Sequence, residues 1–163
     1  MSDGTCPTCG RARDEHDRHL RLHLPDAALA VPEAERPERF WGNAELLAVR
    51  DLGCYVRVLL PIPLTDGYSI TLGTWLSVEP PAFEAIVRAW HDPAAYAALE
   101  VDGRLANGIP PWMDEVLDAP AHASVRTPGQ FPFVDGSEHP LLRHVLHHVW
   151  PHEELLEVYA AYE

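Results

Sequence analysis

The sequence predicts an α+β fold, in which an antiparallel sheet is covered by helices and preceded by a small CxxC module of the zinc-knuckle type. Three observations support this prediction. Apolar and polar residues alternate over 45–78, as in consecutive strands. Residues 80–91 have the apolar spacing of a helix, and the N-terminus carries two cysteines near several histidines. We therefore expect three parts, which are a Cys/His-rich module (1–24), a connector (25–43) and an α+β domain (44–163).

The longer strands are predicted by apolar segments and the turns between them. Residues 45–50 and 54–62 are separated by a short turn, so they predict a hairpin. Asp66-Gly67, a dipeptide typical of hairpin turns, then leads into a third strand at 68–78. The even-numbered apolar residues of that strand share one face, which we assign to the core.

Shorter strands and three helices complete the predicted domain. Segments 122–127 and 131–135 are expected to be edge strands, giving a sheet of about four to six strands. The helix at 80–91 has a single apolar stripe, which consists of Phe83, Ile86, Val87 and Trp90. Two further apolar stripes predict helices at 140–149 and 152–162, near the C-terminus.

The composition restricts the classes of partner. The 163 residues carry a formal net charge of −13, which would repel a phosphate backbone. We therefore expect no nucleic-acid binding, whereas a basic protein partner is compatible with this charge. No apolar run approaches the ~20 residues of a membrane span, so we expect no membrane association. Because no secretory signal is visible, we expect a cytoplasmic location with reduced cysteines.

The strongest single motif is Cys6-Pro-Thr-Cys9, which is followed by His16, His19 and His23. Two thiolates and two imidazoles are a usual tetrahedral ligand set for structural zinc. Three residues separate His19 from His23, as in a zinc finger, so Cys6, Cys9, His19 and His23 are the predicted ligands. His16 is an alternate ligand, because a helix in this region would place all three histidines on one face. The alternative is that the cysteines bind no metal and the histidines are solvated.

A second candidate site lies in the middle of the chain. Trp75, Asn107, Trp112 and Asp114 combine aromatic rings with polar groups that could line a groove. If the protein is an enzyme, we expect its site near the last three of these residues. The alternative is that the aromatic residues belong to the core. No nucleophile elbow, phosphate-binding loop or pair of suitably spaced carboxylates occurs, so no catalytic residue is predicted.

Several segments resemble a bacterial family of unknown function, DUF2199, and they occur in the same order as in that family. These segments are CPTCG (6–10), LGTWLSVEPPAFEAIVRAWHDP (72–93), GRLANGIPPWMD (103–114) and EHPL (138–141). The resemblance implies a small bacterial α+β domain and supplies no activity. Arg13 stands where the family commonly has His, so a metal site here would need one of the later histidines.

These observations favour a non-enzymatic interaction protein over an enzyme. An acidic surface would bind a partner protein, and a bacterial immunity protein against a basic toxin is one form of such a protein. The N-terminal module would be stabilised by structural zinc, which leaves no open coordination position for a reaction.

Overall fold

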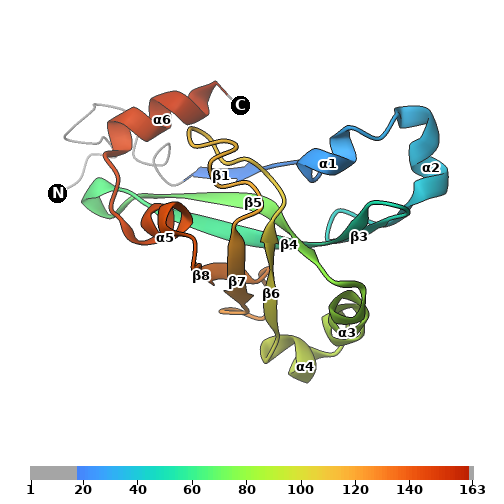
Figure 1. The fold of residues 1–163 in the computed structure, drawn as a ribbon. Coiled ribbons are helices and arrows are strands. Elements are labelled where there is room, and N and C mark those ends of the chain that lie inside the picture. The colour runs from blue at the N-terminus through green and yellow to red at the C-terminus, as the bar shows by residue number, and fades with distance from the viewer. Residues whose placement is uncertain (1–17, 162–163) are drawn as a thin grey trace.

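The computed structural model describes residues 18–161, and one sheet dominates this part of the chain (Figure 1). Eight strands lie in the order β1-β5-β6-β7-β8-β4-β3-β2, and β4 also pairs with β5. Their bounds are β1 Arg18–Arg21, β2 Phe40–Gly42, β3 Leu46–Val49, β4 Gly53–Pro63, β5 Ser69–Val78, β6 Glu100–Leu105, β7 Pro120–Ser124 and β8 Phe133–Gly136. Because β4 pairs with both β5 and β8, the strands from β4 to β8 close into a barrel-like sheet.

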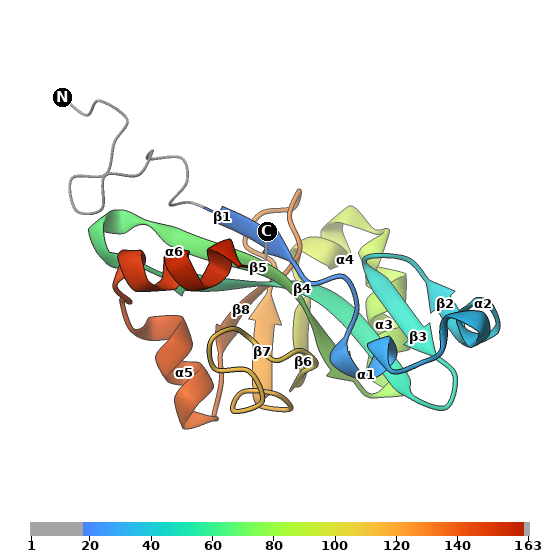
Figure 2. The ribbon, with the colours of Figure 1, turned by 90° about the horizontal axis from the view of Figure 1, so that it is seen from above.

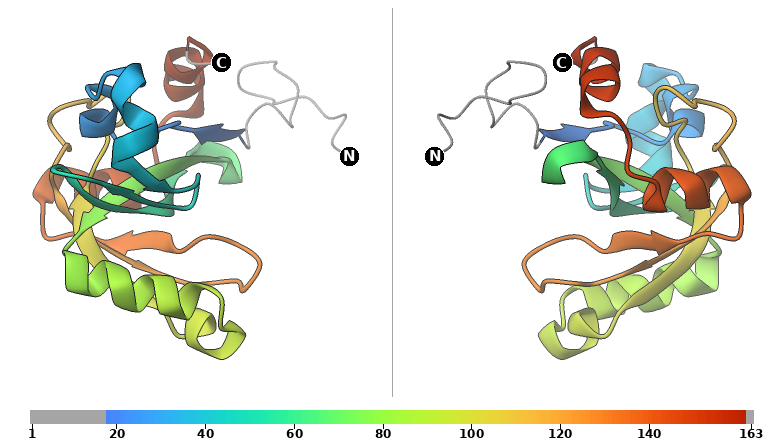
Figure 3. Two further views of the ribbon diagram at one scale, coloured as in Figure 1. Left: turned by 90° about the vertical axis from the view of Figure 1, so that its right-hand side faces the viewer. Right: turned by 90° about the vertical axis from the view of Figure 1, so that its left-hand side faces the viewer.

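The closed sheet corrects the expectation of a simple antiparallel sheet. Two pairings are parallel, namely that of β1 with β5 and that of β4 with β8. β4 and β5 form a long hairpin, which we call the central hairpin. Closure depends on its length, since β4 has 11 residues and β5 has 10. Each of these strands therefore has room for two partners on its outer edge. Figure 3 shows β7 and β8 curling back beneath the hairpin.

The predicted hairpins are confirmed, and their turns explain the local chain path. β3 pairs antiparallel with β4, and β4 pairs antiparallel with β5 along its length. Asp66 and Gly67 have φ of 61° and 76°, the left-handed conformation that these two residue types tolerate best. The Asp66-Gly67 dipeptide therefore correctly predicted the turn between β4 and β5.

Helices lie on both sides of the short strands β6, β7 and β8. They are α1 Asp26–Leu29, α2 Arg36–Arg39, α3 Pro80–Trp90, α4 Pro93–Ala97, α5 Pro140–His147 and α6 His152–Ala160, with 3-10 turns η2 Glu33–Glu35 and η3 Thr65–Gly67. Figure 2 shows α5 and α3 on opposite sides of β6, β7 and β8. Phe83 and Ile86 of α3 are buried as expected, whereas Val87 and Trp90 are only half-buried.

Two apolar clusters lie on opposite faces of the central hairpin. The main cluster contains even-numbered residues of β4 and β5, for example Val58 and Leu72, together with residues of α3, α5 and α6. The second contains the odd-numbered Tyr55 and Trp75 and is covered by Ala28 of α1. The segments that we expected to be an N-terminal module and a connector thus contribute β1, α1, α2 and β2 to the folded unit.

β6 was not predicted as a strand, because Gly103 interrupts its sequence pattern. A Cβ at this position would lie 2.4 Å from the carbonyl oxygen of Ser77 on β5. The glycine therefore allows close approach of two backbones and does not break the strand. In the described part of the chain, no helix is long and apolar enough to cross a membrane.

Candidate functional site

The predicted zinc ligands are only partly described. Cys6, Cys9 and His16 lie outside the described residues. His19 is exposed in β1, and His23 is exposed just after that strand. The described segment is therefore a strand where we considered a helix. Among residues 18–161, no group of three or more His, Cys, Asp or Glu side chains is placed to hold a metal ion.

Two residues of the predicted groove do meet, but in a buried hydrogen-bond network. Asn107 is 1% exposed, and its Oδ1 accepts hydrogen bonds from Thr74 Oγ1 (2.8 Å) and the Trp75 amide (3.2 Å). Its Nδ2 donates to the Leu24 carbonyl and to Asp26 Oδ1, both at 2.9 Å. Every polar atom of this side chain is engaged, so the geometry gives Asn107 a structural role.

The other two residues of the predicted groove lie apart from that network. Trp112 is half-buried and packs against Trp150, with ring centroids 5.0 Å apart. Asp114 is exposed. The structure therefore does not gather Trp75, Asn107, Trp112 and Asp114 around one cavity.

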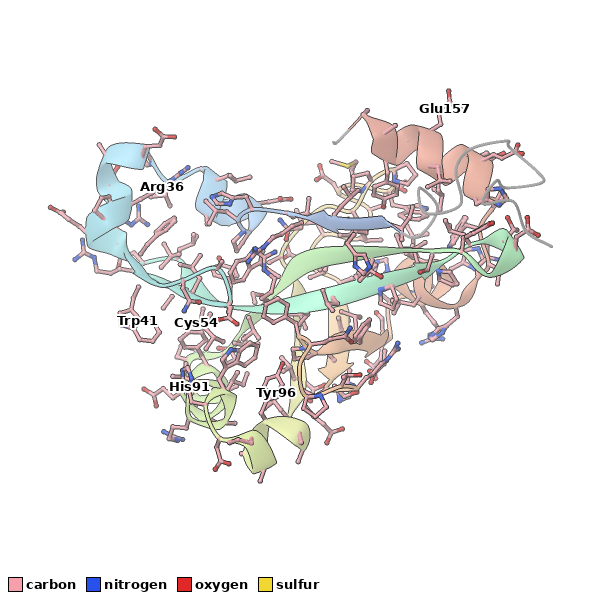
Figure 4. The ribbon with its side chains drawn as sticks, turned by 180° about the vertical axis from the view of Figure 1, so that it is seen from behind. Arg36, Trp41, Cys54, His91, Tyr96 and Glu157 are labelled. Atoms are coloured by element: carbon pink, nitrogen blue, oxygen red, sulfur yellow. The ribbon has the colours of Figure 1, made fainter. Side chains whose placement is uncertain are left out.

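A cavity of about 630 Å³ lies elsewhere, between the α3–α4 corner and the segment before β8. Its walls include Glu45, Trp90, His91, Pro93, Tyr96 and Phe131. We call it the aromatic pocket and define it by Glu45, Trp90, Tyr96 and Phe131. His91 and Tyr96 lie on the side of the sheet that carries α3 and α4 (Figure 4).

The three rings of the aromatic pocket form a fixed wall. The rings of Trp90 and Tyr96 are nearly perpendicular, at 83°, with centroids 5.1 Å apart. The ring of Phe131 lies 6.3 Å from that of Trp90 and is inclined to it by 21°. The hydroxyl of Tyr96 donates a hydrogen bond of 2.5 Å to the Gln130 carbonyl, which holds the phenol in place.

Glu45 supplies the charge of this pocket. The residue is half-buried just before β3, and its carboxylate forms no ion pair with any described residue. Burial raises the pKa of the Tyr96 phenol, and the negative charge of Glu45 raises it further. The Glu45 carboxylate therefore lies within electrostatic range of the Tyr96 phenol.

A second polar cluster lies on the outer face of β6, β7 and β8. His122 Nδ1 is 2.7 Å from Asp135 Oδ1, and His122 Nε2 is 3.3 Å from Glu100 Oε1. Ser124 Oγ donates to Asp135 Oδ2 at 2.5 Å. The hydrogen bond to Asp135 raises the pKa of His122, so the imidazole holds its proton more tightly than usual. Ser124 contacts the carboxylate and not the imidazole, so the three residues are not arranged as a nucleophilic triad.

An exposed tryptophan marks the end of the sheet. Trp41 is 59% exposed on β2, which is an outermost strand like β1, and its ring packs edge-on against Phe83 with centroids 6.1 Å apart. Trp41 lines a surface hollow together with Cys54 and with Leu52, which is 40% exposed. Trp41 and Cys54 lie on the α3 side of the sheet, as do His91 and Tyr96 (Figure 4).

A family model described as an uncharacterized protein conserved in bacteria, DUF2199, matches residues 5–148. The chain belongs to this family. Searches of curated proteins and of solved structures gave no match. The DUF2199 match includes the aromatic pocket, the His122 cluster and Trp41, and it ends before α6.

Sequence reasoning missed the aromatic pocket because its residues come from distant segments. Trp90 was assigned to the buried stripe of α3, and nothing in the sequence connected it with Glu45 or Phe131. For the His122 cluster a signal did exist. The alternation of a strand places His122 and Ser124 on one face and Ala121 and Ala123 on the other, and the structure buries the two alanines.

Proposed function

We propose that this DUF2199 protein is a non-enzymatic interaction protein that binds a basic partner protein. The observation that carries the proposal is the large exposed area of Trp41 on an outermost strand. Tryptophan is enriched among the residues that dominate protein–protein binding energy. An outermost strand also has an unpaired edge, to which another chain can bind.

The charge of this region supports a basic partner. Burial raises the pKa of the Cys54 thiol, and the nearby carboxylates of Glu79 and Glu84 raise it further. Glu79 and Glu84 therefore place negative charge beside Cys54, although Arg39 and Arg50 also line this hollow, and the whole chain has a net charge of −13. Complementary charge would speed association with a basic protein and exclude acidic ones. An immunity protein against a basic bacterial toxin is one form of this function, by analogy alone.

The test compares three immobilised proteins that differ at one exposed apolar residue. Wild type, Trp41→Ala and Leu29→Ala are used to capture proteins from the source bacterium, and the bound proteins are quantified by mass spectrometry. Leu29 is the matched control because it is 54% exposed on α1, which lies on the opposite face of the sheet from α3 (Figure 1). We expect one basic protein to be retained by wild type and Leu29→Ala and lost from Trp41→Ala. The same bound proteins on all three would contradict the proposal, provided that the variants have similar melting temperatures.

An enzyme is the second candidate function. We expected its site near Asn107, Trp112 and Asp114, but the observation that favours an enzyme is the pair of His122 and Asp135. A carboxylate that orients an imidazole is a common arrangement for general acid–base catalysis. A raised pKa would suit His122 to donate a proton. Loss of a measured activity in His122→Gln, with binding of the partner unchanged, would favour this candidate.

A further inference from the structure

We propose that the aromatic pocket binds an organic cation whose charge is spread over methyl groups or a guanidinium plane. The inference goes beyond the proposed function, because the aromatic pocket shares no lining residue with the hollow beside Trp41 and is tested with small cations alone. It rests on Glu45, Trp90, Tyr96 and Phe131, which come from three parts of the chain and meet at one cavity.

The aromatic rings favour a cation over a neutral ligand of the same shape. The face of an aromatic ring is electron-rich, so a cation within about 6 Å of its centroid is attracted to it, and Trp attracts most strongly. Trp90 and Tyr96 are only half-buried and stand nearly perpendicular to each other, at 83°. Two such walls can contact a rounded cation from two sides.

Glu45 adds a requirement for positive charge. A partly desolvated carboxylate is stabilised by a nearby cation, and Glu45 has no ion-pair partner among residues 18–161. A small metal ion would need several oxygen ligands, whereas the three aromatic side chains offer only the Tyr96 hydroxyl, which already donates to the Gln130 carbonyl. A cation with an apolar outer surface fits both the rings and the carboxylate.

Two pairs of probes test the inference by titration calorimetry. Choline is compared with its uncharged isostere 3,3-dimethylbutan-1-ol, and acetyl-arginine amide with acetyl-citrulline amide. We expect at least one charged probe to bind about tenfold more tightly than its uncharged counterpart. Preference for choline would indicate a free quaternary ammonium ligand, and preference for arginine would indicate a side chain of a partner protein.

Variants connect the binding to the pocket. Glu45→Gln keeps the shape of the side chain and should weaken binding of the charged probe about tenfold. Glu84→Gln is the matched control, since it removes the same charge from an exposed position on α3 and should bind like wild type. Tyr96→Leu should also weaken binding. Equal binding of charged and uncharged probes, no saturable binding of either charged probe, or equal affinity in Glu45→Gln and Glu84→Gln would overturn the inference. Because no partner protein takes part, these outcomes leave the test with Trp41→Ala unaffected.

Discussion

His122 on β7 and Asp135 on β8 are joined by a hydrogen bond of 2.7 Å at the place where the register of the two strands shifts. The irregularity lies between His122 and Ala123. A bulge interrupts the backbone ladder, so a side-chain bond beside it can hold the strands together. The pKa of His122 is raised, chiefly by this bond, although burial partly opposes the rise. Burial alone would raise the pKa of Asp135, but hydrogen bonds from Ser124 and His122 lower it.

The first prediction is that the pair stabilises the protein most between about pH 4 and pH 6.5. A raised pKa in the folded state means that the contribution of His122 is complete below pH 6.5 and is lost as the pH rises through the folded value. The lowered pKa of Asp135 means that its contribution is lost as the pH falls through its folded value. Both side chains are about one-third exposed, so we expect the pair to add only about 0.5–1 kcal/mol to the unfolding free energy. Urea unfolding of wild type and His122→Gln at pH 5.5 and pH 9 measures this. Exposed His147→Gln is the control, and an equal difference at both pH values would contradict the prediction.

We expect Arg57 to contribute to the unfolding free energy as much as a buried apolar residue does. It is 1% exposed and stacks on Trp75, with its guanidinium carbon 4.2 Å from the ring centroid. It donates to the carbonyls of Ala44, Leu22 and Gly73 at 3.0, 2.7 and 3.0 Å. Burial lowers its pKa to about 10, so it stays charged at neutral pH.

The second prediction follows from these bonds. Arg57→Met would fill a similar volume but remove all three hydrogen bonds, at a cost of about 2–4 kcal/mol in unfolding free energy. The carbonyls of Gly73 and Ala44 would keep bonds from the Leu22 amide and Arg21, whereas that of Leu22 would lose its donor. Urea unfolding measures the loss, and Arg50→Met, at an exposed turn, is the control. An unfolding midpoint equal to that of wild type would show that desolvation of the guanidinium cancels the benefit of its hydrogen bonds.

The third prediction concerns the packing of α3 on the sheet. Phe83 is 6% exposed and also supports the ring of Trp41. Phe83→Ala would leave a cavity and cost about 3–5 kcal/mol, enough to unfold a domain of ordinary stability. Thermal unfolding measures this, with exposed Glu84→Ala on the same helix as the control. An unchanged melting temperature would show that α3 contributes little to the core.

The fourth prediction tests the buried network of Asn107. In Asn107→Asp a second carboxylate would lie beside Asp26, where the amide now donates a 2.9 Å hydrogen bond. The repulsion and the lost donors should cost about 2–4 kcal/mol at pH 7, and less at pH 5, where one carboxyl takes up a proton. Asn43→Asp is the control. Asn43 Oδ1 accepts hydrogen bonds from the backbone amides of Glu45 and Leu46, and a carboxylate oxygen can accept the same bonds. Equal losses in both variants would contradict the role given to Asn107.

The parts of the fold that the sequence predicted are those determined by neighbouring residues. The alternation over 68–78 and the turn at Asp66 and Gly67 specify the central hairpin, and the apolar spacing specifies α3. Closure of the sheet depends on contacts between distant segments, such as Leu59 beside Phe133, which no local pattern indicates. The aromatic pocket was not predictable for the same reason.

Trp75 shows why the sequence suggested a groove where the structure has a second apolar cluster. Its strand pattern correctly placed it on the face opposite the main cluster, where a large apolar residue suggested a groove. That face is covered by a second apolar cluster containing Ala28 and Val31. Those residues come from a segment that is short of apolar periodicity, so its coverage of the sheet was not visible in the sequence.

The last prediction concerns zinc at the N-terminus. If Cys6 and Cys9 bind the ion as thiolates with His19 and His23, the purified untagged protein should contain about one equivalent of zinc. Both histidines are exposed in the described structure, so their imidazoles are accessible to an ion.

Elemental analysis of wild type and of a Cys6→Ser/Cys9→Ser variant measures the zinc content. Cys54→Ser is the matched control, because Cys54 lies in β4 beside the main core and should not affect binding. Removal of zinc by a chelator should leave the urea midpoint of the sheet nearly unchanged, since the main cluster contains none of the predicted ligands. Less than about a tenth of an equivalent in wild type, or equal zinc in wild type and the double variant, would show that the CxxC pair is not a metal site.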